Sequence, residues 1–282
     1  MALGDVRAHF DLDAYCQRIG YDGPRTPSLD TLRALHASHP AAIPFENLDP
    51  LLGQPVRLDL ESLQEKLLRN GRGGYCFEHN LLFSAALQTL GFPVVGLAAR
   101  VLWGAPAGIV RPRSHMLLIV EHAGTRYIVD VGFGGLTLTA PLRFEIDSEQ
   151  STPHEAFRIV RGGDHFVLEA GINGVWAPIY RFTEEIQLPV DYEVANWYTS
   201  THPSSIFVTS LMAARAIPGA RLTLSNSEFT IRRRDGSTER QRLPDGQAIE
   251  SVLRLQFGIS LPESPKLAAT LDRLVATSNA FH

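Results

Sequence analysis

Apolar side chains recur at helical spacing through the first ninety residues of the chain. Leucines at positions 29, 32 and 35 follow Ser28, and leucines at 60, 63, 67 and 68 follow Asp59; serine and aspartate are both residue types that cap helices. Pro40 is expected to close the second helix, and Gly91 to end the fourth. The pattern therefore predicts four helices, over residues 11–19, 29–36, 60–69 and 76–90.

Beyond Pro93 the pattern changes to short apolar runs separated by glycine turns, which is typical of antiparallel strands. The spacing of these runs predicts a compact sheet or barrel, and after it a mixed segment with a hairpin turn at Asp235-Gly236. Strands are predicted over residues 94–103, 115–121, 126–133, 157–160, 166–169, 175–182, 207–213, 221–224, 229–233 and 238–243. Helices are predicted over residues 192–200, 248–257 and 265–277.

Composition and charge narrow the class of protein. The 282 residues, 44% of them hydrophobic, can bury a substantial core, and a net charge of -4 gives no uniformly basic face. We therefore expect neither nucleic acid nor a membrane as a partner. The chain starts without a basic-then-apolar signal, and its two cysteines, Cys16 and Cys76, are too few for a disulfide framework or a thiolate metal site. We expect a cytoplasmic protein with reduced thiols and no metal.

Cys76 lies between a glycine-rich turn and an apolar run, in the stretch GRGGYCFEHN. A thiol at a helix start meets unpaired N–H groups and the positive end of the helix dipole, and both favour the thiolate. Glycines at 73 and 74 would let a substrate carbonyl approach the sulfur closely. A buried structural cysteine between two helices fits this stretch equally well. A partner base is needed to decide between the two interpretations.

His115 and Asp130 are the best candidates for that partnership. His115 opens an apolar strand, and Asp130 lies inside the next one, where a carboxylate is costly to bury without a partner. If the loop between the strands has two or four residues, Glu121 lies opposite Arg126, and Asp130 is a diagonal neighbour of His115 at roughly 7–8 Å. A three-residue loop would place the two on opposite faces. The alternative is a half-buried histidine and a local salt bridge between Asp130 and Arg126.

Cys76, His115 and Asp130 together could form a catalytic triad. The thiolate attacks an acyl carbon, the imidazolium donates a proton to the leaving group, and the carboxylate orients the ring. His79 lies one helical turn beyond Cys76 and is expected to point into packing or solvent, and His202 is a weaker candidate in a loop. A cysteine hydrolase or transglutaminase-like enzyme acting on peptides is the alternative enzyme class, and a binding protein without turnover is the third.

Five motifs give the chain a resemblance to the arylamine N-acetyltransferase family. They occur in the family's order and at similar spacing, and they span nearly the whole chain. A lone DVGFG would be weak evidence, whereas the five together are highly specific. The motifs are IPFENL at 43–48, RGGYCFEHN at 72–80, SHM at 114–116, DVGFG at 130–134 and STHP at 200–203.

The resemblance implies an α+β fold with a catalytic core like that of cysteine proteases and transglutaminases. Its parts would be an N-terminal helical bundle over residues 1–92, an antiparallel β-barrel over 93–195 and a C-terminal α/β lid over 196–282. The resemblance also implies a ping-pong reaction, in which acetyl-CoA acetylates Cys76, CoA leaves, and an arylamine, arylhydroxylamine or arylhydrazine takes the acetyl group. The partners would be coenzyme A and a small aromatic amine or hydrazine, and the protein a monomer or homodimer.

The resemblance also implies site residues. Its catalytic residues would be Cys76, His115 and Asp130. Its acceptor pocket would contain Phe45, Phe133 and Phe207, each of which has ordinary core packing as its alternative. Its coenzyme A pantetheine would be flanked by Ser114, Gly132 and Gly134.

Four charged residues near these motifs have simpler interpretations. Arg111 and Arg113 could contact the phosphates of coenzyme A. We favour the alternative that both are loop arginines whose side chains are solvated. Arg72 and Glu46 are expected to form a structural ion pair that supports the turn before Cys76.

Overall fold

The computed structural model describes residues 9–106 and 108–279 and begins with a group of helices. The four helices predicted from the first ninety residues are confirmed. Their bounds are Leu12–Ile19 (α2), Leu29–Ala42 (α3), Leu60–Gln64 (α5), which continues as the π-helical turn Glu65–Arg69 (η1), and Cys76–Leu90 (α6). Two short elements lie between them, the strand Phe45–Glu46 (β1) and the helix Leu48–Leu51 (α4).

Helix α3 runs further than the sequence predicts. Pro40 lies inside its last turn instead of closing it, and the helix is capped at Ile43. Proline cannot donate the hydrogen bond that would continue the helix. His39 and Pro40 are both buried in the core, so tertiary packing carries the helix past the proline.

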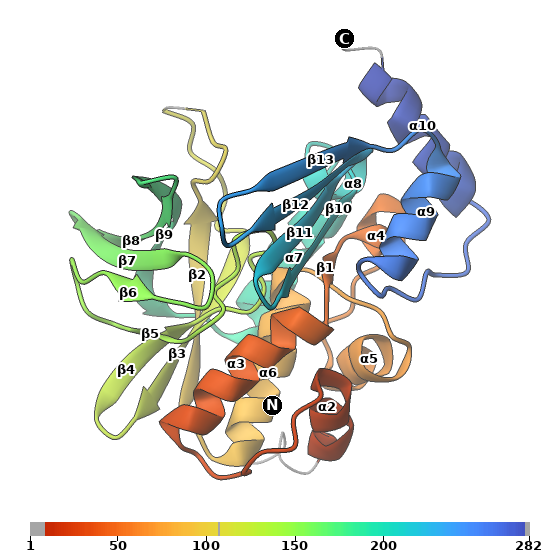
Figure 1. Cartoon of the computed structure of the whole chain (residues 1–282). Helices are drawn as coiled ribbons and strands as arrows, with labels where there is room; N and C mark the ends of the chain where they lie inside the picture. The colour runs from red at the N-terminus through yellow and green to blue at the C-terminus, as the bar shows by residue number, and fades with distance from the viewer. Residues whose placement is uncertain (1–8, 107, 280–282) are drawn as a thin grey trace.

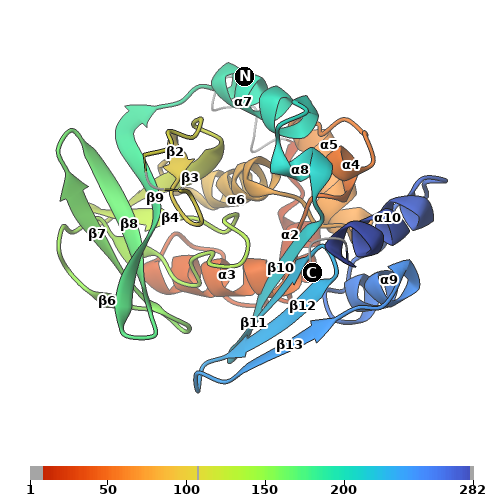
Figure 2. The same ribbon diagram turned by 90° about the horizontal axis from the view of Figure 1, so that it is seen from above.

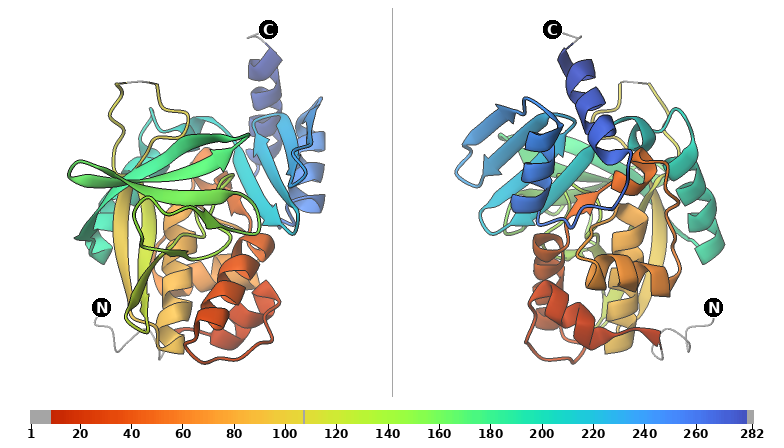
Figure 3. Two further views of the ribbon diagram at one scale, coloured as in Figure 1. Left: turned by 60° about the vertical axis from the view of Figure 1, so that its left-hand side comes forward. Right: turned by 90° about the vertical axis from the view of Figure 1, so that its right-hand side faces the viewer.

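Eight antiparallel strands form a strongly curved sheet on one side of the molecule (Figures 1 and 3), in the order β5-β4-β3-β2-β9-β8-β7-β6. The two edge strands, β5 and β6, are joined through one side chain. Gln150 accepts from the backbone N–H of Arg143 at 2.7 Å and donates to its carbonyl at 2.8 Å, so the sheet is nearly closed into the expected barrel. The strands are Val94–Val101 (β2), His115–His122 (β3), Thr125–Val129 (β4), Leu142–Arg143 (β5), Gln150–Ser151 (β6), Ala156–Gly162 (β7), His165–Ile172 (β8) and Val175–Ile186 (β9).

A second antiparallel sheet, in the order β1-β10-β11-β12-β13, carries the C-terminal part of the chain. Its first strand, β1, comes from the helical region and pairs with β10, so residues far apart in sequence share one sheet. Seen from above (Figure 2), helices α9 and α10 cover the face of this sheet that is turned away from the barrel. The remaining elements are Pro189–Thr201 (α7), Ile206–Thr209 (α8), Met212–Ile217 (β10), Ala220–Ser225 (β11), Glu228–Arg233 (β12), Thr238–Arg242 (β13), Gly246–Leu255 (α9) and Leu267–Asn279 (α10).

The strand predicted over residues 207–213 is wrong in its first half, which forms helix α8. Asn47, from the helical region, donates to the carbonyls of Phe207 at 2.8 Å and Ser210 at 2.7 Å. These bonds satisfy backbone groups that a sheet would otherwise pair, so a distant side chain decides the local structure. None of the described helices is long and apolar enough to cross a membrane.

Candidate active site

Cys76 is the first residue of helix α6, and the turn before it is tightly packed. Glu78 accepts from the backbone N–H of Tyr75 at 2.9 Å and so caps the helix start. A Cβ at Gly73 would lie 2.0 Å from the carbonyl oxygen of Pro44, and one at Gly74 would lie 2.6 Å from the Glu78 carboxylate. Packing beneath the helix start therefore requires both glycines, and the approach of a substrate over them stays a prediction.

The β3–β4 hairpin has the two-residue loop on which the pairing of His115 depends. Glu121 lies opposite Arg126, and the loop residues Ala123 and Gly124 both have positive φ, at 51° and 73°. The even loop puts His115 and Asp130 on one face, and the Nε2 atom of His115 lies 2.7 Å from Oδ2 of Asp130. The His115 side chain is 3% exposed and that of Asp130 is 0% exposed, so water does not compete for this hydrogen bond.

The second oxygen of Asp130 is held as firmly as the first. Its Oδ1 atom accepts from Asn80 Nδ2 at 3.0 Å and from the backbone N–H of Gly132 at 2.9 Å. Asn80 also donates to the carbonyl of Met116 at 2.8 Å. Because Asn80 lies one turn after Cys76 on α6, it ties the cysteine helix to both strands of the hairpin.

Electrostatics favour a charged ring at His115. Burial opposes the charge, but the Asp130 carboxylate and the Cys76 sulfur outweigh burial and raise the pKa of His115 to about 10. Burial alone would raise the pKa of Asp130, and the imidazolium instead lowers it. With Nε2 bonded to Asp130, Nδ1 is the ring nitrogen left for Cys76, whose thiol donates weakly to the Ser114 carbonyl at 3.5 Å.

A cavity of about 580 Å³ opens onto Cys76 and His115, and the predicted pocket residues Phe45, Phe133 and Phe207 line it. The predicted pantetheine residues Ser114, Gly132 and Gly134 line the same cavity. A Cβ at Gly132 would lie 2.9 Å from the Cα atom of Cys76, so only glycine fits beside the helix start. No sequence pattern indicated the other lining residues, which include Trp103, Tyr198, Thr223, Ser225 and Arg232.

The two loop arginines before His115 are engaged with protein groups. Arg113 forms an exposed ion pair with Glu185 at 2.5 Å. Arg111 lines the cavity, but its guanidinium donates to the carbonyls of Trp103 at 3.4 Å and Gly104 at 2.9 Å. Both arginines thus have protein partners, and whether either contacts a phosphate of coenzyme A stays a prediction.

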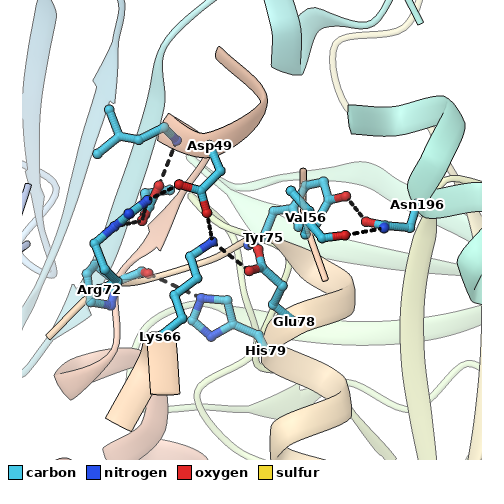
Figure 4. A network of polar contacts seen from close by, with 11 residues as sticks. Asp49, Val56, Lys66, Arg72, Tyr75, Glu78, His79 and Asn196 are labelled. Carbon is cyan, nitrogen blue, oxygen red and sulfur yellow. Dashed lines mark hydrogen bonds and ion pairs between the residues drawn. The ribbon is translucent and has the colours of Figure 1, made fainter. Parts of the chain in front are cut away.

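A buried network of charges supports the turn before Cys76 (Figure 4). The predicted pair is confirmed, with Arg72 Nε 2.8 Å from Glu46 Oε1. Arg72 also contacts Asp49 at 2.7 Å, and Lys66 joins Asp49 to Glu78 at 2.6 Å each. The network connects α4, the π-helical turn and the start of α6, so it fixes the position of the cysteine helix. No local sequence pattern indicated Asp49 or Lys66.

His79 is excluded as the partner of Cys76. Its Nε2 atom donates to the Pro44 carbonyl at 3.2 Å, and its Nδ1 atom accepts from His39 at 2.9 Å. Burial lowers the pKa of His79 to about 4, so the ring stays neutral. Of the two expected environments, packing and solvent, the structure shows packing, because His79 is buried.

Comparisons with known proteins agree with the fold and the motifs. The N-acetyltransferase family model matches residues 28–266, which places the chain in the class of N-acetyltransferases. The arylamine N-acetyltransferase of Mycobacterium tuberculosis H37Rv is 45% identical over 273 residues, which cover 94% of this chain and 96% of that protein. The enzyme of Escherichia coli K12 is 41% identical and covers 96% of both chains. The chain therefore belongs to the arylamine N-acetyltransferase family and is a transferase.

Solved structures support the same assignment. The arylamine N-acetyltransferase of Mycobacterium marinum superposes with a TM-score of 0.91 at 43% identity, covering 94% of this chain and 100% of that one. Its complex with CoA gives a TM-score of 0.90 at 44% identity, covering 94% of this chain and 99% of that one. The predicted α+β fold is thereby confirmed.

Proposed function

We propose that the protein transfers the acetyl group of acetyl-CoA to an arylamine, arylhydroxylamine or arylhydrazine through an acetyl-Cys76 intermediate. The observation that carries the proposal is the buried 2.7 Å bond between His115 and Asp130, in the cavity that also contains Cys76 at a helix start. One relative, from Salmonella typhimurium, is named both an arylamine N-acetyltransferase and an N-hydroxyarylamine O-acetyltransferase. Its name supports both nitrogen and oxygen acceptors.

In the first half-reaction the Cys76 thiolate attacks the thioester carbonyl carbon of acetyl-CoA. The bond from that carbon to the CoA sulfur breaks, and His115 gives its proton to the departing sulfur. Because Cys76 begins α6, we assign stabilisation of the oxyanion to the N–H groups of the first turn of this helix. Asp130 keeps the His115 ring in the orientation that both steps require.

In the second half-reaction the amine nitrogen attacks the acetyl carbon. His115 accepts a proton from the nitrogen as the carbon–sulfur bond to Cys76 breaks, which regenerates the thiolate–imidazolium pair. The acetyl-cysteine must meet an amine before it meets water, and the aromatic side chains of Phe45, Phe133 and Phe207 favour an apolar acceptor there. These roles of Cys76, His115, Asp130 and the phenylalanines form one testable assignment.

The reaction also suggests where the protein acts. Cys76 must remain a reduced thiol to accept the acetyl group, and both Cys16 and Cys76 are free and buried. A reducing compartment maintains such thiols, so we place the protein in the cytoplasm.

The experiment incubates the protein with acetyl-CoA and then with an arylamine such as aniline. Intact-mass spectrometry should show a gain of one acetyl group that disappears when the amine is added, and peptide mapping should place the acetyl group on Cys76. The variant Cys76→Ser should show no adduct, and Cys16→Ser, the matched control, should behave like the wild type. Retention of the adduct by Cys76→Ser would falsify the assignment, and continued release of CoA beyond one equivalent per protein in the absence of amine would indicate a hydrolase.

A further inference from the structure

Three buried side chains that the proposed mechanism does not use form one hydrogen-bonded chain. The hydroxyl of Tyr15 on α2 lies 2.9 Å from Nδ1 of His39 on α3. The Nε2 atom of His39 lies 2.9 Å from Nδ1 of His79 on α6, and Nε2 of His79 lies 3.2 Å from the carbonyl oxygen of Pro44. The three side chains are 0%, 0% and 1% exposed. The chain therefore joins three helices to the segment that enters β1.

The protons of this chain have one consistent arrangement. The Pro44 carbonyl can only accept, so His79 must donate from Nε2 and accept at Nδ1. His39 must then donate from Nε2 and accept at Nδ1, which makes Tyr15 the donor at the far end. Burial lowers the pKa of both histidines, that of His79 to about 4, and so keeps each ring neutral, as the arrangement requires. Tyr15 and His39 thereby hold His79 in the tautomer that donates to Pro44.

His79 also contacts the residue that follows Pro44. Phe45 lines the active-site cavity together with Cys76. The ring of Phe45 lies nearly parallel to the His79 ring, with an interplanar angle of 7° and 6.4 Å between the centroids. Its centroid is 6.2 Å from that of Phe207, which lines the same cavity. An offset parallel pair at such a separation is a favourable aromatic contact, so His79 supports the ring that the cavity uses.

The backbone of Phe45 is held on both sides. On one side His79 donates to the carbonyl of Pro44, and on the other the backbone N–H of Glu46 donates to the carbonyl of Gly74 at 2.8 Å. The Phe45 ring cannot move away from the cavity with its backbone unless one of these bonds breaks. An aromatic wall that is already fixed loses little conformational entropy when a planar ligand packs against it, and this favours binding.

We propose that His79 is a positioning residue for the acceptor, because it holds Phe45 where the aromatic ring of an arylamine or arylhydrazine packs. Tyr15 and His39 act one step further away, by fixing the tautomer of His79. The proposal rests on the proposed function, in which such an acceptor enters the cavity. Both ring nitrogens of His79 are bonded within the chain, so neither serves the reacting groups. Its loss should weaken acceptor binding and leave the attack of Cys76 on acetyl-CoA intact.

The test measures the two half-reactions separately in His79→Leu, which removes both the donor to Pro44 and the ring beside Phe45. Acetylation of Cys76, followed by the stopped-flow release of CoA, should keep the wild-type rate. The phenylhydrazine concentration that gives half-maximal deacetylation should rise about tenfold, as expected for the loss of one buried hydrogen bond and its aromatic contact. Hydrazine, the same nucleophile without the ring, should react as it does with the wild type.

Two further variants separate positioning from general damage to α6. His79→Gln keeps a donor for Pro44 and an acceptor for His39, because an amide carries one of each, as a neutral imidazole does. It should recover most of the affinity for phenylhydrazine. His154→Leu is the matched control, since His154 Nε2 also donates to a backbone carbonyl, that of Ile217 at 2.9 Å, but His154 lies outside the cavity wall. It should leave both half-reactions unchanged.

The link through Phe45 is tested by a double-mutant cycle. If His79 acts through Phe45, the losses for phenylhydrazine in His79→Leu and Phe45→Leu should be less than additive in the double variant. Strict additivity would overturn the proposal, and so would equal losses with phenylhydrazine and hydrazine. Heteronuclear NMR of the imidazole nitrogens should place the proton on Nε2 of both His39 and His79, and a proton on Nδ1 of either ring would overturn the role of the chain.

The proposed function can fail independently of this inference. A wild-type protein that never forms the acetyl adduct on Cys76 would disprove the proposed function. Equilibrium binding of aniline would then decide the positioning role alone. Weaker binding by His79→Leu would support that role, and unchanged affinity would overturn it.

Discussion

Asp130→Asn is the substitution that tests the proposed mechanism most directly. In the wild type, two donors fix the Oδ1 atom of Asp130: the side chain of Asn80 at 3.0 Å and the backbone N–H of Gly132 at 2.9 Å. The carbonyl oxygen of the new amide must take this position, because an NH₂ group there would face two donors. The NH₂ group then takes the position of Oδ2, which lies 2.7 Å from His115 Nε2.

The consequence is a change of tautomer at His115. An NH₂ group can only donate, so Nε2 must accept, and the ring proton moves to Nδ1, the nitrogen that faces Cys76. A protonated Nδ1 on a neutral ring cannot take a proton from the thiol. The carboxylate that does most to offset burial at His115 is also gone, so burial is opposed only by the Cys76 sulfur and the pKa of the ring falls. Both effects remove the thiolate–imidazolium pair at neutral pH.

We expect Asp130→Asn to reduce the rate of acetyl transfer by about a thousandfold to ten-thousandfold, as in triads whose carboxylate fixes the tautomer. The assay is stopped-flow detection of CoA release in the first turnover at pH 7, together with the pH dependence of Cys76 alkylation by iodoacetamide. The shape of the site is preserved, so the exchange of one hydrogen bond should cost about 1 kcal/mol and lower Tm by about 2–4 °C.

The matched control is Asp164→Asn, which alters an aspartate–histidine pair on the barrel surface, with Asp164 Oδ1 3.0 Å from His165 Nδ1. It should keep the wild-type rate. The reasoning would be refuted if Asp130→Asn retained a rate within tenfold of the wild type, or if its alkylation profile matched the wild-type profile. Unfolding of Asp130→Asn, seen by circular dichroism, would show that Asp130 mainly serves stability.

The remaining predictions concern the support of the site. Arg72→Met leaves the buried carboxylate of Glu46 without its cation and Asp49 with Lys66 alone, and urea unfolding should show a loss of about 3–5 kcal/mol; a loss below 1 kcal/mol would contradict the network's role. Gly132→Ala should lower both kcat and Tm, because its Cβ would lie 2.9 Å from the Cα atom of Cys76 and the helix start would have to shift; an unchanged kcat would count against this. Burial lowers the pKa of His36 and of His79 to about 4. Between pH 6.5 and 4 these two histidines bind more protons in the unfolded chain than in the folded one, so Tm should fall as the pH falls through this window. A constant Tm would disprove the linkage.

Local sequence patterns were sufficient for most elements of the fold. Helical leucine spacing and capping residues predicted α2, α3, α5 and α6, and apolar runs between glycine turns predicted the strands of the barrel. The alternation of side chains along β3 and β4 even predicted the pairing of His115 with Asp130, once the hairpin loop was taken as even. The same patterns could not set limits between structural regions, and the boundaries at residues 92 and 195 stay a prediction.

Only the tertiary structure decided the features that depend on contacts between distant segments. Asn47 donates a hydrogen bond to the backbone carbonyl of Phe207 in the short helix 206–209. Strand β1 pairs with β10 of the C-terminal sheet. Lys66 forms ion pairs with Asp49 and Glu78 in the network below Cys76. Arg232 is the first of three consecutive arginines in the sequence, where nothing marks it as special, yet it lines the active-site cavity. The physical reason is that periodicity along the chain records which face of an element is buried, whereas the partner of that face is set by packing among elements far apart in sequence.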